Sequence, residues 1–408
     1  MSAPKPDFAF VQSLYRGLEE GVRQAVDRTV EAVAAARRAG RKVAVVTGSG
    51  PNLHEGVSTL IAELIRAGIV QGVSTSSAVV AHEMAGGLDK VRRVDGRALG
   101  LPEKLLPRGG LFEMTLMSPE TERLVRREMA LDEQLLAKVR EAPGEVIIKA
   151  AGNMGYPVGL RTERLALQIE ALARAHGLPF ERVAGLGADP RTMIGAAAEA
   201  GVPALVSVPQ LVGGGTVGMC VGDSIPLKQR SALMARLLGE AAVIIESGVA
   251  LTQEIHDGPF ETYTGHGLWS GWDGEQTYSL QDKTLVRIDL DPNLRKVWEI
   301  ERSGGEVQAT IDKGLPKTKT FKVPFRMEMS GFARLEGSIP IVGDLGVIWP
   351  VLAWRAAEEL GLRLELLSYP QESEQGKRMR EWIVEEVKVL DRDRMLERLA
   401  GGSAGGLS

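Results

Sequence analysis

The stretch Lys42–Glu83 decides the fold and reads KVAVVTGSGPNLHEGVSTLIAELIRAGIVQGVSTSSAVVAHE. It opens with the continuously apolar run Lys42–Thr47, a pattern that is typical of a strand covered on both faces, as in a parallel sheet. A Gly-rich turn follows, and then a predicted helix over Gly56–Ala67 and a second short strand around Val70–Val73. Strand, helix and strand in this order predict the beginning of a parallel sheet with helical crossovers.

The rest of the chain repeats this alternation of short apolar runs with helical patterns. The predicted strands are Lys42–Thr47, Val146–Ala150, Ala204–Val208, Ala242–Glu246, Thr284–Leu290 and Ser338–Val342. The predicted helices are Val22–Ala39, Gly56–Ala67, Ser118–Glu141, Thr162–His176, Arg191–Ala200, Gln229–Gly239 and Ile348–Leu360. Such alternation indicates a doubly wound α/β fold with a mostly parallel sheet.

The pattern also predicts how the chain is divided. The expected segments are an N-terminal helical part (1–41), an α/β nucleotide-binding core (42–303), an inserted β-rich excursion (304–330), a completion of the core (331–395) and a flexible tail (396–408). The stretch Gly258–Gln281 is rich in glycine and aromatic residues and has neither helical nor strand periodicity. A loop this long is either disordered or functional, and we predict a lid or a subunit contact.

Composition excludes several classes of protein. The chain of 408 residues has 49 Lys+Arg against 53 Asp+Glu, a net charge of -4, which argues against nucleic-acid binding. Hydrophobic residues make up 44% and charged residues 25%, as in ordinary globular proteins. The apolar runs are too short for a membrane span, and the start lacks the apolar core of a signal peptide, so we expect a cytoplasmic protein.

Metal and disulfide chemistry are not expected. Cys220 is the only cysteine, which excludes an internal disulfide and a four-cysteine zinc site. The five histidines never have the four-residue spacing of a helical zinc motif.

Two turns after predicted strands carry groups that suit a phosphate or a ribose. The first contains Gly48, Gly50, Pro51 and Asn52, directly after the strand Lys42–Thr47. Backbone N–H groups at a helix start attract phosphate, and glycines permit close approach. The alternative is a Gly-rich connection without a ligand.

The second turn holds a run of hydroxyls that includes Ser76 and Ser77. These hydroxyls could bond a ribose or a phosphate, or they could cap the next helix. His82 and Glu83 follow within two helical turns. The alternative for His82 is a structural histidine.

Two further Gly-rich loops follow the strands Val146–Ala150 and Ala204–Val208. Gly152 and Asn153 lie in the first loop, and Arg161 behind them could pair with a carboxylate or a phosphate, or be a surface residue at a helix start. Gly214 lies in the second loop, in a run of three glycines that cannot form a stable helix or strand interior. Asp223, after this run, could bind an amine or cap a helix.

Acidic residues end two other predicted strands. Asp289 and Asp291 follow the strand Thr284–Leu290 in the position where nucleotide-binding folds hold ribose hydroxyls. Asp344 follows the strand Ser338–Val342. Each of the three could instead cap a helix. Because all these loops follow strands, a parallel sheet would bring them to one edge, which is where such folds bind ligands.

Several of these segments resemble one known family. Gly50–Glu83 resembles the opening of the NAD-binding domain in the archaeal-type ornithine cyclodeaminase family, the LOR/SDH-like conserved domain, with its Gly-Pro loop, helix, strand and Ser-rich A-V-H-(D/E) segment. Gly201–Val208, Leu285–Asn293 and Ile341–Leu352 resemble later segments of the same domain. More distantly, Val342–Ala353 is similar to the end of deoxyhypusine synthase.

The resemblance implies a deoxyhypusine-synthase-like variant of the Rossmann fold that binds NAD and is usually a homo-oligomer. It implies that cofactor or cleft residues are Gly50, Pro51, Asn52, Ser76, Ser77, Asp289, Asp291 and Asp344. Phe332 stands where deoxyhypusine synthase has its nucleophilic lysine, so that activity is not expected.

We therefore predict an NAD-dependent enzyme that acts on a small amino acid or amine by hydride transfer at a C–N carbon, through an imine. His82 is the predicted acid/base group, because the pKa of histidine lies near neutrality. Glu83 or Asp223 would anchor the amine, and Arg161 a carboxylate. Two alternatives stay open, namely a non-catalytic nucleotide sensor and a lyase or isomerase that binds a phosphorylated metabolite.

Overall fold

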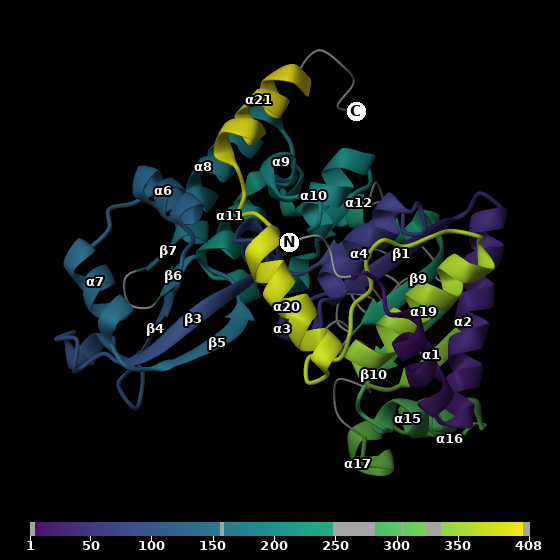
Figure 1. Ribbon diagram of the computed structural model, residues 1–408. Coiled ribbons are helices and arrows are strands. Elements are labelled where there is room, and N and C mark those ends of the chain that lie inside the picture. Colours follow the sequence, from purple (N-terminus) through teal and green to yellow (C-terminus); the bar gives the residue numbers. More distant parts are fainter. Residues whose placement is uncertain (1–4, 156–158, 248–281, 304, 324–335, 403–408) are drawn as a thin grey trace.

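A six-stranded parallel sheet forms the centre of the protein in the computed structural model, which describes residues 5–155, 159–247, 282–303, 305–323 and 336–402 (Figure 1). The strands are β1 (Lys42–Thr47), β2 (Gly72–Thr75), β8 (Ala204–Val206), β9 (Ala241–Ser247), β10 (Thr284–Asp289) and β11 (Ser338–Val342), in the order β11-β10-β9-β1-β2-β8. All five neighbouring pairs are parallel. When the six strands are numbered along the chain and the sheet is read from β8 to β11, their order is 3-2-1-4-5-6. The direction of winding therefore reverses between β1 and β9.

The apolar runs produce this sheet because helices cover both of its faces. Val43 and Val45 pack on the side of α2 (Glu20–Arg38), α4 (Val57–Arg66) and α19 (Leu345–Glu359). Ala44 and Val46 pack on the opposite side, against α12 (Leu227–Glu240). The prediction of an α/β fold with a mostly parallel sheet is confirmed, and the predicted strands Lys42–Thr47 and Ser338–Val342 match β1 and β11 residue for residue.

Further helices surround this core. They are α1 (Phe8–Gly17), α3 (Ser49–His54), α5 (Ser77–Met84), α8 (Arg161–His176), α9 (Phe180–Gly187), α10 (Met193–Ala200), α11 (Thr216–Ser224), α15 (Asn293–Arg302), α20 (Glu374–Glu386) and α21 (Arg392–Gly402). The predicted N-terminal helical part corresponds to α1 and α2, which pack against α19. Within the described ranges, no helix has the length and apolar character needed to span a bilayer.

A small antiparallel unit is inserted between α5 and α8. Its sheet has the order β4-β3-β5, formed by β3 (Leu88–Asp95), β4 (Leu111–Thr115) and β5 (Glu145–Ala150), and it extends away from the parallel core on the left of Figure 1. Two helices, α6 (Pro119–Glu128) and α7 (Glu133–Glu141), and the short pair β6 (Met154–Gly155) and β7 (Gly159–Leu160) complete it. The inserted β-rich part of the chain therefore lies far upstream of residues 304–330.

Two predictions within this unit are wrong. Val146–Ala150 belongs to the antiparallel sheet, and none of the residues of β5 is fully buried, although the run is apolar enough to resemble a core strand. The single helix predicted over Ser118–Glu141 is broken, because Asp132 accepts the backbone N–H of Leu135 at 2.9 Å and starts a second helix.

Two predictions near the C-terminal part are also wrong. Residues 305–323 contain the helices α16 (Glu306–Asp312) and α17 (Lys317–Phe321) instead of strands. The Lys/Thr alternation at Lys317–Lys322, on which the prediction of a β-rich segment rested, has only Phe321 as an apolar residue, so a strand there would have almost no apolar face to bury. Residues 396–402, predicted as part of a flexible tail, belong to α21, which buries Leu399. Residues 324–330 and 403–408 and the predicted functional loop Gly258–Gln281 lie outside the described residues.

Candidate functional site at the carboxyl edge of the sheet

The crevice between β1 and β9 is bridged by a short chain of hydrogen bonds. Asn52, fully buried in α3, donates from Nδ2 to the carbonyl oxygen of Gly48. Ser247, the last residue of β9, donates from Oγ to Oδ1 of Asn52 at 2.8 Å, and Trp349 Nε1 donates to Oγ of Ser247 at 2.8 Å. The turn after β1, the end of β9 and α19 are thus held together where the sheet changes its direction of winding, which is where ligands of such folds bind.

Two buried hydroxyls beside this crevice have no hydrogen-bond partner among the described residues. Thr47 and Thr75 end β1 and β2, directly after the paired residues Val46 and Ser74. Both threonines are fully buried, and no described residue hydrogen-bonds to either Oγ1. Nearly all buried polar groups in native proteins have a partner. The two hydroxyls therefore mark a place at the sheet edge that a polar ligand or an ordered water would complete.

The serine-rich turn after β2 is tied to the glycine-rich loop after β8. Ser76 caps α5, since its Oγ accepts the backbone N–H of Val79 at 3.2 Å. The Oγ of Ser77 donates to the carbonyl oxygen of Leu211 at 2.6 Å and accepts the N–H of Gly214 at 2.9 Å. A Cβ on Gly214 would lie 2.8 Å from the backbone of Ser77, so only glycine allows this close approach. Ser76 thus has the capping role that the sequence left open.

The acidic residues after β10 and β11 lie at the same edge and also bond backbone groups. Asp289 accepts the N–H of Asp291 at 2.9 Å, and its carbonyl oxygen accepts the N–H of Gly343 at 2.9 Å. Asp291 accepts the N–H of Asn293 at the start of α15, at 2.9 Å. Asp344 accepts the N–H of Gly346 at 2.7 Å and caps α19. The sheet therefore brings the predicted acidic residues to the edge that holds the turn after β1.

Two histidines occupy the side of this edge that faces the antiparallel unit. His82 on α5 has Nδ1 2.6 Å from the carbonyl oxygen of Ala151, just after β5. Because a carbonyl oxygen only accepts, the proton of His82 is assigned to Nδ1, which leaves Nε2 as a lone pair. His54, at the end of α3, has Nδ1 3.4 Å from Nη2 of Arg380 on α20. Because a guanidinium only donates, Nδ1 of His54 accepts and Nε2 carries the proton.

Both histidines are neutral near pH 7. Burial is the main cause that lowers the pKa of His54, and the charges of Arg380, His82 and Lys149 lower it further. Burial also lowers the pKa of His82, although its bond to Ala151 and the nearby carboxylate of Asp89 act in the opposite direction. The pair combines one acceptor nitrogen on His82 with one donor nitrogen on His54. This combination suits proton transfer at neutral pH.

The other predicted catalytic and substrate-binding residues do not join this cluster. Glu83 is buried, and its carboxylate accepts the N–H groups of Met193 at 2.8 Å and Ile194 at 3.0 Å at the start of α10, while burial raises its pKa to about 7. Asp223 is exposed on α11. Arg161 is buried, and its Nε lies 2.5 Å from the carboxylate of Glu128.

Gly152 and Asn153 directly follow Ala151, whose carbonyl group contacts His82, and they lie in the antiparallel unit. Their backbone N–H groups donate to Oδ2 of Asp89 at 2.9 and 2.8 Å. Asn153 has a left-handed φ of 55° and donates from Nδ2 to the carbonyl oxygen of Ala85 at 3.1 Å. These two residues therefore position the loop that holds His82.

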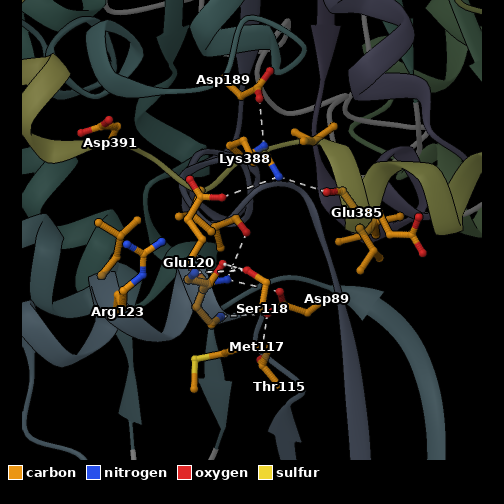
Figure 2. A pocket seen from close by; sticks show the side chains of 18 of the residues that line it. Asp89, Thr115, Met117, Ser118, Glu120, Arg123, Asp189, Glu385, Lys388 and Asp391 are labelled. Carbon is orange, nitrogen blue, oxygen red and sulfur yellow. Dashed lines mark hydrogen bonds and ion pairs between the residues drawn. The ribbon is translucent and has the colours of Figure 1, made fainter. Parts of the chain in front are cut away.

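A pocket of about 690 Å³ lies behind this loop, where α6 faces the segment that joins α20 to α21. Figure 2 shows Lys388 at its centre, where the backbone N–H of Lys388 donates to Asp189 at 2.8 Å and Nζ lies 3.8 Å from Glu120. Of the predicted site residues, only Asn153 lines this pocket. The pocket is therefore separate from the histidine pair, and no predicted catalytic residue lines it.

Sequence analysis missed His54, Ser247, Trp349 and Arg380 as members of the site. Of these four residues, only Ser247 had a local signal in the sequence. It is a polar residue that directly follows a predicted strand, and such residues lie at the ligand-binding edge of a parallel sheet. Among the described residues, no group of His, Cys, Asp and Glu has the arrangement of a metal site.

No protein-family profile matches the chain, and no curated protein sequence matches it. The chain is similar to solved structures at low identity. One is AgrE in a ternary complex with ornithine and NAD+, with 13% identity and a TM-score of 0.39, covering 84% of this chain and 34% of AgrE.

A second is ArgZ, an arginine dihydrolase from the ornithine-ammonia cycle in Cyanobacteria, with 12% identity and a TM-score of 0.38, covering 83% of this chain and 32% of ArgZ. A third is a conserved LOR/SDH protein from Methanococcus maripaludis S2, with 13% identity and a TM-score of 0.34, covering 88% and 70% of the two chains. The chain spans about a third of the length of AgrE and ArgZ. Similarity at this level does not carry the ligands or activities of those proteins over to this chain.

Proposed function

We propose that this protein binds NAD at the carboxyl edge of its parallel sheet and uses it on a small amino acid or amine. The supporting observation is the row formed by Ser247, Thr47 and Thr75 across three adjacent strands. Both threonine hydroxyls in this row are buried, and no described residue hydrogen-bonds to them. The row lies where the winding of the sheet reverses, the position at which doubly wound folds bind dinucleotides. The resemblance of Gly50–Glu83 to an NAD-binding domain points to the same turn.

The residues at this edge fit a dinucleotide. The threonine hydroxyls and the turn Gly48–Asn52 would contact it, and Asp289, Asp291 and Asp344 lie at the ends of the next strands to bond its hydroxyls. The same resemblance favours the deoxyhypusine-synthase-like variant of the fold, with Gly50 and Pro51 against the cofactor. When bound, NAD would accept a hydride from the substrate carbon that carries the nitrogen.

His82 is the base of this reaction. Its neutral Nε2 would take the proton that the amine nitrogen loses as the amine becomes an imine. The carbonyl group of Ala151 holds the ring by its other nitrogen, so the lone pair has a fixed direction. Addition of water would then release ammonia from the imine. Alternatively, an amine of the substrate (cyclisation) or another nucleophile would add to the imine carbon, and the hydride would return.

The first experiment measures NAD binding to the purified full-length chain by calorimetry. A panel of amino acids and amines is then added, and nicotinamide absorbance and ammonia are followed. We expect NAD binding together with turnover of at least one amine. Absence of dinucleotide binding would refute the proposal, and binding of a phosphorylated metabolite instead would favour the lyase or isomerase alternative.

A second candidate is a nucleotide sensor without turnover. The observation that favours it is the placement of Glu83, Arg161 and Asp223, which bond elsewhere or face solvent, so that His82 is the only predicted catalytic group in the histidine cluster. Dinucleotide binding without turnover of any amine in the panel would support the sensor. Self-association stays a prediction, which light scattering coupled to size-exclusion chromatography tests directly.

A further inference from the structure

Arg380 connects three elements beside the histidine pair. It extends from α20, and its Nη2 donates to the carbonyl oxygen of Ile148 in β5 at 2.5 Å and to Nδ1 of His54 in α3 at 3.4 Å. The guanidinium therefore lies between the parallel core and the antiparallel unit, next to His54 and on the side of the sheet edge where His82 contacts Ala151.

Among the described residues, the carboxylates of Glu55 and Glu381 act on the charge of Arg380 from beyond ion-pair distance. In the described part of the chain, no carboxylate lies within ion-pair distance of its guanidinium, and its buried Nε has no hydrogen-bond partner. Lys149, the neighbouring cation, is paired with Glu113 at 2.5 Å. Burial is the main cause that lowers the pKa of Arg380, while the charges of Glu55 and Glu381 act in the opposite direction.

Neither Glu55 nor Glu381 forms an ion pair with Arg380. Glu55 accepts the N–H of Gln371 at 2.7 Å, and burial raises its pKa to about 7, so its carboxyl is only partly ionised at neutral pH. Glu381 bonds to Lys90. Arg380 is half-buried, and its hydrogen bonds to Ile148 and His54 go to neutral acceptors. A bound carboxylate would supply a negative charge and an acceptor for its Nε–H.

We propose that Arg380 binds the carboxylate of an amino-acid substrate and holds His54 as the hydrogen-bond donor beside the base His82. The inference rests on the proposed function, because it names the substrate class of the same site. Arg161, which the sequence indicated for the carboxylate, is already paired with Glu128. A substrate held by Arg380 would place its amine near Nε2 of His82 and would receive a hydrogen bond from Nε2 of His54.

The binding test compares L-lysine with cadaverine, the same molecule without its carboxylate, and extends to other such pairs. With NAD present, the wild-type chain should bind the amino acid about 10–100-fold more tightly than the amine, as a charged hydrogen-bonded pair requires. Arg380→Met should remove this preference, and Arg380→Lys should keep part of it. Arg378→Met, an exposed arginine on the same helix, is the matched control and should change nothing.

Three outcomes would overturn the inference. The first is a preference for the amino acid that survives Arg380→Met, and the second is the absence of this preference in the wild-type chain for every pair. The third is weaker NAD binding by Arg380→Met, which would assign the arginine to a cofactor phosphate. If NAD does not bind at all but the Arg380-dependent preference persists, the proposed function fails while this inference stands.

A second measurement needs neither NAD nor substrate. Selective ¹⁵N labelling of histidine reports which ring nitrogen carries the proton. We expect Nε2–H in His54 and Nδ1–H in His82. In Arg380→Met, His54 alone should shift toward a mixture of tautomers. An Nδ1–H tautomer of His54 in the wild-type chain would contradict the role assigned to Arg380.

Discussion

Replacing Thr75 by valine should stabilise the free protein and weaken its binding to NAD. The two side chains have nearly the same shape, and the variant removes only a hydroxyl that is fully buried and has no partner among the described residues. An unsatisfied buried polar group costs about 1–3 kcal/mol. We therefore expect the free energy of unfolding of the free protein to rise by about 1 kcal/mol or more.

The effect on the ligand has the opposite sign. If the hydroxyl of Thr75 bonds the dinucleotide, its loss removes about 0.5–1.5 kcal/mol of binding, or about 2–12-fold in Kd. Thr47→Val should behave in the same way, since Thr47 lies beside Thr75 at the ends of adjacent strands. Urea unfolding of the free protein and calorimetric titration with NAD measure the two effects separately.

Thr29→Val is the matched control. Thr29 is also fully buried, but its Oγ1 donates to the carbonyl oxygen of Ala25 at 2.8 Å, so the valine variant should gain no stability. If Thr75→Val, like Thr29→Val, gains no stability, the hydroxyl of Thr75 is bonded within the fold. If stability rises but the Kd for NAD is unchanged, the ligand does not occupy the space beside Thr75.

Three further predictions follow from single groups. His82→Gln should lower turnover by about 10²–10⁴-fold, because it removes the base, and leave the Kd for NAD unchanged; steady-state rates and calorimetry check this, and an undiminished rate would exclude His82 as the base. The pKa of Glu83 is raised from 4.5 to about 7 in the folded protein, so the contribution of Glu83 to stability is full below pH 4.5 and is lost as the pH rises to about 7. The urea midpoint of unfolding should therefore fall over this pH range, and it should fall less steeply in Glu83→Gln than in the wild-type chain. Equal slopes in the two proteins would contradict the prediction. Arg230→Met should cost about 3–5 kcal/mol in the free energy of unfolding, because it leaves the carboxylate of Glu181 buried and without the guanidinium that lies 2.5 Å away; Glu181→Leu in the same chain should restore part of this loss, and full additivity of the two variants would refute the pairing.

Much of the central fold could be predicted from the sequence because it depends on local patterns. The runs Lys42–Thr47 and Ser338–Val342 are continuously apolar between their polar ends, a pattern that is typical of a short strand covered on both faces. Their order along the chain then places the following turns at one edge of the sheet. This reasoning was sufficient to place Asn52, Asp289 and Asp344 at one edge of the sheet, as the structure has them.

Local patterns did not predict the antiparallel insertion. The strand Leu88–Asp95 carries Lys90, Arg92 and Arg93 among its apolar residues, so it matches neither the buried nor the alternating pattern of a strand. Val146–Ala150 looks like a core strand, but it pairs with Leu88–Asp95 and keeps part of its surface exposed. Which strand an apolar run joins depends on partners that are distant in the chain.

The sequence by itself determined the doubly wound core and the edge at which its loops meet, because periodicity and turn residues act over a few neighbours. Only the tertiary structure decided which polar groups bond one another at that edge. Glu83 caps a helix that begins 110 residues later, and His54 meets an arginine 326 residues away. A carboxylate or an imidazole has the same local sequence signal whether it caps a helix or faces a ligand, so its role depends on which distant groups the fold brings within hydrogen-bond distance.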